Sequence, residues 1–135
     1  MRNRLGVGLI GIGDIGRRHL TLLADNPRVR LVAAAEPIAE RRGAASALVA
    51  EVTGDWSAVV SHRDVEAVFI TTPPHVHREM TLAALDAGKH VFLEKPMTAT
   101  MPDAEAIVRR AQQSDRIVLV GFQERHNIAF IEMRR

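Results

Sequence analysis

Cysteine is absent from the 135-residue sequence, which rules out a disulfide framework and fits a reducing compartment, so we expect a cytoplasmic protein. Aromatic residues are scarce, at 4% of the chain, whereas hydrophobic residues make up 47%. Because much of this apolar content is alanine, we expect a core of close-packed aliphatic layers. No apolar run approaches the length of a membrane span, so no membrane partner is expected.

We expect no secretion signal at the start of the sequence. The segment from Met1 to Gly13 resembles one superficially, because basic residues precede an apolar stretch. Glycines interrupt that stretch, however, and no small-residue cleavage site follows. We therefore interpret this segment as the first strand of the fold.

Clustered positive charge is absent as well. The formal net charge is only +2, and the basic residues, mostly arginines, are scattered in ones and twos among acids. Nucleic-acid-binding proteins usually carry a basic patch, often with stacking aromatic side chains. We therefore expect no nucleic-acid partner. A metal site is not expected either, because His75 and His77 have no third ligand at a useful spacing.

Buried strands alternate with helices along the chain, which is long enough for one compact core. Helical patterns cover about residues 14–24, 38–50, 74–87 and 100–111, with a short strand possible at 51–53 and further helical turns at 56–61. Gly88 is the expected left-handed stop after the third of the long helices. This order predicts an α/β fold with a doubly wound parallel sheet. The continuous apolar runs that predict buried strands are Leu5–Ile10, Val29–Ala35, Ala67–Ile70, Val91–Leu93 and Ile117–Val120.

A glycine motif, Gly11 to Gly16, follows the first strand directly and opens the first helix. Gly11 permits the tight turn, Gly13 lets a pyrophosphate approach the backbone, and Gly16 lets the helix pack closely on its strand. The helix start presents free N–H groups to phosphates. Glu36 stands twenty positions beyond Gly16, where an acid can bind a ribose. Together these features predict a dinucleotide site.

Ligands of doubly wound sheets lie beyond the carboxyl ends of the strands. The segments that follow the predicted strands are therefore the candidates for the site. They are residues 11–16, Glu36, residues 71–77, residues 94–96 and residues 121–123.

These segments resemble the N-terminal domain of the Gfo/Idh/MocA family, the glucose-fructose oxidoreductase and inositol dehydrogenase family. The resemblance runs from about Arg4 to the end of the chain, and Glu94-Lys95-Pro96, preceded by Ala87 to Val91, is its most specific motif. Members are NAD(P)-dependent oxidoreductases that act mostly on sugars, cyclitols and related polyols. Each couples a Rossmann domain to a second α/β domain.

The resemblance implies that Lys95 is catalytic and lies beside the nicotinamide, where it helps to move the proton that accompanies hydride transfer. A lysine that is partly desolvated near a positive ring is suited to this task. We also hypothesise that a cis peptide bond precedes Pro96. The implied cofactor-binding residues are Gly11, Ile12, Gly13, Asp14, Ile15, Gly16, Glu36, Thr71, Thr72, Pro73, His77, Glu94, Lys95 and Gln123.

The preferred cofactor is expected to be NAD, because the Glu36 carboxylate would repel the 2′-phosphate of NADP. Arg41 and Arg42 leave NADP open, although their place on a predicted helix favours a solvated face. For His77, a contact with the ligand and a bond to backbone are equally supported. His19 is expected to be a packed or rim histidine on the first helix.

The family resemblance assigns residues 1–123 to the cofactor domain and residues 124–135 to the start of the substrate domain, cut short at Arg135. We therefore expect this chain to bind the dinucleotide with little turnover, because substrate positioning supplies much of the rate. The full-length protein is expected to bind a sugar or polyol and to form a homo-oligomer. Two alternatives stay open: a non-catalytic dinucleotide sensor or interaction module, and another Rossmann-like enzyme such as a methyltransferase.

Overall fold

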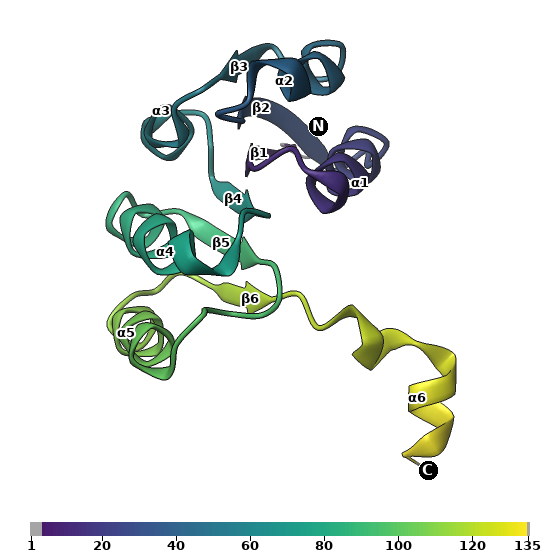
Figure 1. The fold of residues 1–135 in the computed structure, drawn as a ribbon, viewed down its shortest axis with the longest axis vertical. Coiled ribbons are helices and arrows are strands. Elements are labelled where there is room, and N and C mark those ends of the chain that lie inside the picture. The colour runs from purple at the N-terminus through teal and green to yellow at the C-terminus, as the bar shows by residue number, and fades with distance from the viewer. Residues whose placement is uncertain (1–3, 135) are drawn as a thin grey trace.

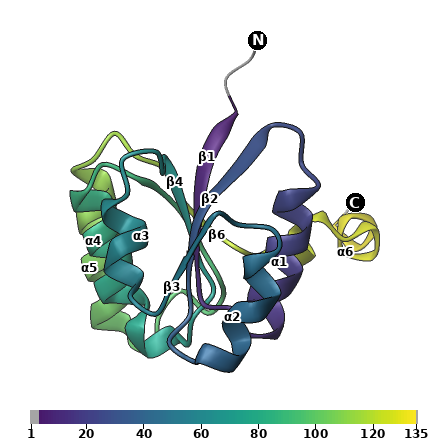
Figure 2. The ribbon, with the colours of Figure 1, turned by 90° about the horizontal axis from the view of Figure 1, so that it is seen from above.

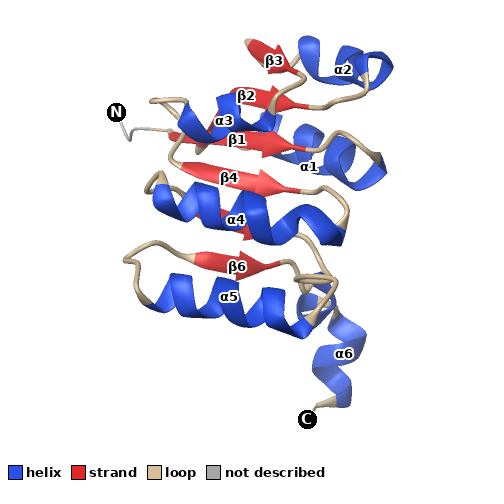
Figure 3. Cartoon of the chain, turned by 60° about the vertical axis from the view of Figure 1, so that its left-hand side comes forward, coloured by secondary structure: helices blue, strands red, loops and turns tan. Residues whose placement is uncertain are grey.

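A single parallel sheet organises the computed structural model, which describes residues 4–134; Met1 to Asn3 and Arg135 lie outside the described residues. Its strand order is β3-β2-β1-β4-β5-β6, and every neighbouring pair is parallel. Figure 3 shows the strands side by side, pointing the same way. The predicted doubly wound sheet is thereby confirmed. The strands are β1 (Leu5–Ile10), β2 (Val29–Ala35), β3 (Glu51–Thr53), β4 (Ala67–Ile70), β5 (His90–Leu93) and β6 (Val118–Val120).

Helices cover both faces of the sheet (Figure 2). On one face lie α1 (Asp14–Ala24) and α2 (Ala39–Ser46), and on the other lie α3 (Trp56–Ser61), α4 (His77–Asp86) and α5 (Met101–Gln112). Each face has its own aliphatic core. Leu9 and Leu20 belong to the first core, and Ile70 and Ile107 belong to the second. Burial of apolar runs on both sides explains why the strands read as continuous hydrophobic segments.

Local signals fix several helix ends. The Thr100 hydroxyl accepts a hydrogen bond from the Asp103 N–H at the start of α5, which satisfies one free amide of the first turn. Gly88 follows α4 with a φ of +71°, the left-handed stop that the sequence predicts. The turn before α4 is a short 3-10 helix, η1 (Pro74–Val76).

Helix α2 is shorter than predicted. It ends at Ser46, whereas the sequence pattern suggested a helix to about residue 50. The N–H groups of Leu48 and Val49 both bond to the Ala45 carbonyl oxygen, which turns the chain, and Val49 is buried in the core under α2. The need to bury Val49 and to begin β3 therefore overrides the helical propensity of the alanine-rich segment.

The end of the chain leaves the body of the molecule. After β6 come a short 3-10 helix, η2 (Gln123–His126), and α6 (Ile128–Met133), which projects away from the sheet in Figure 1. The apolar side chains of Ile128 and Met133 are exposed. Within residues 4–134, no helix has the length and apolar character needed to cross a membrane.

Candidate functional site

The candidate residues converge on the edge of the sheet where the parallel strands end. The glycine loop follows β1, Glu36 follows β2, Thr71 follows β4, and Glu94 follows β5. These four strands are neighbours in the sheet. Residues up to 83 positions apart, from Gly11 to Glu94, thus share one edge, as the sequence predicts for a doubly wound sheet.

Three glycines of the loop have different reasons to lack a side chain. Gly11 has a φ of +95°, which L side chains rarely adopt. A Cβ on Gly16 would lie 1.9 Å from the Gly11 carbonyl oxygen, so Gly16 is required by the close approach of α1 to the loop. A Cβ on Gly13 would meet nothing within 4 Å. The fold itself does not need a glycine at position 13, and the open space beside it suits a ligand that lies against the backbone.

The loop also offers hydrogen-bond donors. Gly13 caps α1 without a side-chain hydrogen bond, and within residues 4–134 no acceptor is found for the N–H groups of residues 13–16. Asp14 in the first turn forms an ion pair with Arg17. The first turn of α1 therefore points free amides and the positive end of its dipole at the open space beside Gly13. These are the features that bind a phosphate group, so the loop fits a dinucleotide.

Glu36 is buried, with 3% of its surface exposed, and holds the loop to the end of β2. One carboxylate oxygen accepts a hydrogen bond from the Ile12 N–H at 2.7 Å, and the other accepts one from the Ile38 N–H at 3.0 Å. Each oxygen of a carboxylate has a second lone pair. The carboxylate therefore orders the loop and keeps acceptor capacity for hydroxyl groups.

Arg42 departs from the expected solvated face. It is partly buried, and its guanidinium donates to the backbone oxygens of Glu36 (2.7 Å) and Pro37 (2.9 Å). Space for it comes from Gly54, because a Cβ there would lie 2.6 Å from the guanidinium. Arg41 is exposed, as expected. Arg42 thus braces the backbone around Glu36 instead of facing solvent.

The segment after β4 is fastened to the glycine loop and to α4. The Thr71 hydroxyl donates to the Gly11 carbonyl oxygen at 2.6 Å, and the Thr72 hydroxyl donates to the Met80 sulfur at 3.4 Å. Pro73 is exposed next to them. Thr71 and Thr72 therefore present fixed side chains at the edge of the sheet.

His77 is fully buried at the start of α4. Its Nε2 lies 2.7 Å from the Thr72 carbonyl oxygen, and its Nδ1 lies 3.1 Å from the Met97 carbonyl oxygen. This is the geometry of the backbone-bonded alternative. His77 connects the segment after β4 to the segment after β5, so it holds these two segments of the site together.

Glu94 ends β5 and collects three hydrogen bonds. Its Oε1 lies 2.8 Å from the His19 Nε2 and accepts from the Gln123 amide at 2.6 Å, while its Oε2 accepts from the Lys95 N–H at 3.0 Å. Burial of the carboxylate raises its pKa, but the hydrogen bonds from His19, Gln123 and the Lys95 backbone outweigh that effect. The pKa of Glu94 therefore lies below its ordinary value, and the group is ionised at neutral pH.

Lys95 follows directly and is exposed. Within residues 4–134 its ammonium group has no hydrogen-bond or ion-pair partner, so it is free to meet a ligand. The peptide bond between Lys95 and Pro96 is cis, which confirms the hypothesis made from the sequence.

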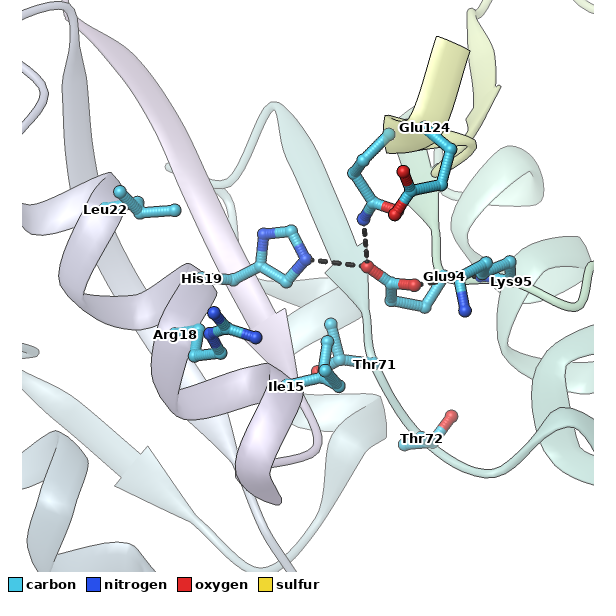
Figure 4. Close-up of a pocket in the computed structure, with 10 residues that line it drawn as sticks. Ile15, Arg18, His19, Leu22, Thr71, Thr72, Glu94, Lys95 and Glu124 are labelled. Carbon is cyan, nitrogen blue, oxygen red and sulfur yellow. Dashed lines mark hydrogen bonds and ion pairs between the residues drawn. The ribbon is translucent and has the colours of Figure 1, made fainter. Parts of the chain in front are cut away.

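A cavity of about 550 Å³ lies between α1 and η2, lined by some of these side chains (Figure 4). In Figure 4, the His19 ring and the Glu94 carboxylate point toward one another and are joined by their hydrogen bond. Four residues of this site were not predicted from the sequence: Arg18, His19, Leu22 and Glu124. The sequence pattern that could have indicated this helix face is the spacing of Ile15, His19 and Leu22, which recur on one face of a helix that begins at the glycine loop. The cavity is lined by Ile15, Arg18, His19, Leu22, Thr71, Thr72, Glu94, Lys95, Gln123 and Glu124.

The aromatic surroundings of His19 explain its position. Its ring packs edge-on against Phe92, with ring centroids 5.1 Å apart, and against Phe69 at 5.7 Å. The expectation of a packed histidine is thus correct, but its polar partner makes it part of the site as well. In the part of the chain that the structure describes, no group of three or more potential ligands could hold a metal ion.

Comparison with known proteins agrees with this geometry. Residues 5–122 match the family described as "Oxidoreductase family, NAD-binding Rossmann fold", GFO_IDH_MocA. Inositol 2-dehydrogenase of Salmonella typhimurium is 34% identical over 135 residues, which cover 96% of this chain and 40% of that protein. The chain thus spans about 40% of the length of such relatives.

Solved structures show the same fold. Scyllo-inositol dehydrogenase from Lactobacillus casei, with bound NAD(H) and scyllo-inositol, gives a TM-score of 0.90 at 31% identity and covers 98% of this chain and 40% of that chain. A 3-ketoreductase from Actinomadura kijaniata, in complex with TDP-benzene and NADP, gives 0.88 at 30% identity and covers 97% and 42%. The chain therefore belongs to the Gfo/Idh/MocA oxidoreductase family and carries its NAD-binding Rossmann fold.

Proposed function

We propose that this chain is the cofactor-binding domain of an NAD-dependent oxidoreductase that transfers hydride between nicotinamide and a hydroxyl-bearing carbon of a sugar, cyclitol or related polyol. The observation that carries the proposal is the free amides of residues 13–16, flanked by Glu36 on one side and Lys95 on the other. Relatives named inositol 2-dehydrogenase and levoglucosan dehydrogenase support the substrate class.

The order of the strands supports an extended dinucleotide along this edge. Glu36 and Glu94 end β2 and β5, which are separated by three strand spacings, or about 14 Å, with the glycine loop between them. The adenosine ribose then lies by Glu36, the diphosphate by Gly13, and the nicotinamide half in the cavity at Lys95. The buried carboxylate of Glu36 favours NAD over NADP, because a 2′-phosphate beside it would be repelled.

Lys95 is proposed to be the catalytic residue. When bound, nicotinamide supplies the hydride acceptor, and the substrate hydroxyl must lose its proton at the same time. The neutral amine form of Lys95 accepts that proton at Nζ and becomes the ammonium. The Lys95 backbone N–H donates to the Glu94 carboxylate at 3.0 Å, so the side chain starts from a held backbone position. Thr71, Thr72, Pro73 and Gln123 are proposed to border the nicotinamide half.

We further propose that residues 1–123 form the cofactor domain and that residues 124–135 begin a substrate domain. The projection of α6 from the sheet supports this division. Substrate contacts from a second domain are proposed for the whole protein. The homo-oligomer is likewise proposed for the whole protein and not for this chain. The isolated chain is expected to bind the cofactor without appreciable turnover, since it holds no more than one wall of a substrate site.

A pair of variants tests the proposal. In the complete protein, Lys95→Ala should reduce kcat by at least a hundredfold and leave the Kd for NADH within about threefold of the wild type, because a general base acts on the chemical step. Glu36→Ala should raise the Kd for NADH and reduce the difference between the Kd values for NADH and NADPH. Full turnover of the Lys95→Ala protein would refute the catalytic assignment, and tighter binding of NADPH than NADH by the wild type would refute the cofactor preference.

A further inference from the structure

Glu94 is the charge that is most firmly fixed in the cavity. We propose that Glu94 biases the site toward the oxidised, positively charged form of the nicotinamide, so that it sets the balance between NAD⁺ and NADH binding. This inference rests on the proposed function, since it places the nicotinamide half in the cavity beside Glu94.

The position of the carboxylate is determined from three sides. His19 on α1, Gln123 on η2 and the backbone of Lys95 all hold it, with contacts of 2.6 to 3.0 Å. Only 7% of the Glu94 surface is exposed, so water screens the charge of its carboxylate only weakly. A charge with this support cannot turn away when the ligand changes its own charge, which makes it part of a preorganised electrostatic environment.

The other charged groups of the cavity differ in this respect. Arg18, Lys95 and Glu124 line the same cavity, but their side chains are exposed to solvent. Their fields are screened by water, and the side chains can move to suit either form of the ligand. Glu94 is therefore the charged group of the cavity that is least screened and most firmly held in place.

The expected size follows from Coulomb's law. A nicotinamide ring is cationic when oxidised and neutral when reduced, so a carboxylate at an assumed separation of about 5–7 Å attracts only the oxidised form. At an effective dielectric constant of about 40, between the values for a site near the protein surface and for bulk water, this attraction corresponds to roughly a tenfold difference in affinity. Tenfold tighter binding of the oxidised form lowers the reduction potential of the bound two-electron couple by about 30 mV.

The experiment compares Kd values for NAD⁺ and NADH by calorimetry at pH 7, in the wild-type chain and in two Glu-to-Gln variants. Glu94→Gln removes the fixed charge and keeps the shape of the side chain. Glu124→Gln, an exposed carboxylate on the rim of the same cavity, is the matched control. Glu94→Gln should weaken NAD⁺ about tenfold and change NADH less than about threefold, whereas Glu124→Gln should change their ratio less than twofold.

Two results would overturn the inference. Equal weakening of both forms by Glu94→Gln would mean that Glu94 supports only the shape of the site, and an equal shift of the ratio by Glu124→Gln would mean that the bias is a general surface effect. If Glu94→Gln does not fold, as judged by circular dichroism, Glu94→Asp decides. Its carboxylate lies one methylene farther back, so NAD⁺ affinity should fall while NADH affinity holds, and an unchanged ratio contradicts the proposal. If neither form binds the wild-type chain, the proposed function itself fails.

Discussion

At this site, single residues that are needed for packing can be distinguished from residues that are needed for binding. Gly13 and Gly16 belong to one motif, yet only Gly16 is demanded by the fold, because its Cβ would lie 1.9 Å from the Gly11 carbonyl oxygen. Gly13 has open space and an ordinary negative φ of −77°. The motif therefore combines a structural requirement with a binding requirement, and these can be tested apart.

Alanine at Gly16 should lower stability, whereas alanine at Gly13 should weaken NADH binding. Gly16→Ala should cost about 2–3 kcal/mol in unfolding free energy, since the loop or α1 must shift. Gly13→Ala should change stability by less than about 0.5 kcal/mol and weaken NADH binding at least tenfold. Urea denaturation and calorimetry on both variants measure these effects. A Gly13→Ala protein with wild-type affinity for NADH would remove the loop from the binding site.

Glu94 also links stability to pH. Its pKa is lower in the folded chain than its ordinary value of about 4.3 in an unfolded one, so the unfolded state binds the proton more tightly. The stabilisation is therefore complete above the unfolded-state pKa and is lost as the pH falls through the folded-state pKa. Glu94→Gln should flatten this acid limb of stability when urea unfolding is compared at pH 7 and at successive values below 4.5. An acid limb of unchanged steepness would argue against the assignment.

Elements, in contrast with contacts, were largely readable from the sequence. The runs Leu5–Ile10 and Val29–Ala35 match β1 and β2 residue for residue, because strands covered on both faces are continuously apolar. The end of α2 was wrong, since burial of Val49 competes with an alanine-rich helical pattern. The bond from His19 to Glu94 could not be read from spacing, because its partners are 75 positions apart and meet only after the sheet has formed.

The start of α5 gives a prediction at the scale of one element. Thr100→Ala removes the hydroxyl that accepts from the Asp103 N–H, and it should destabilise the chain by about 1 kcal/mol. Thr100→Ser retains an N-cap hydroxyl and should stay within about 0.5 kcal/mol of the wild type. Thermal unfolding followed by circular dichroism measures both. A loss of equal size in both variants would show that the threonine methyl group, not the cap, stabilises this end.

The whole molecule is a scaffold whose neighbouring strand ends bring together groups from distant parts of the sequence. The contacts of the site require β1, β4 and β5 to lie side by side, since Thr71 holds the Gly11 loop and His77 joins the segments after β4 and β5. Under the proposed function, substrate recognition also involves a second domain of the whole protein. Cofactor binding, by contrast, is expected of this chain by itself.

Titration of NADH into the purified 135-residue chain tests this most directly. We predict saturable binding of one NADH per chain, and we predict that Gly13→Val, which fills the space beside the free amides, abolishes it while circular dichroism and thermal unfolding stay close to the wild type. A wild-type chain that is folded by the same criteria and yet gives no binding heat with NADH or NAD⁺ would contradict the account.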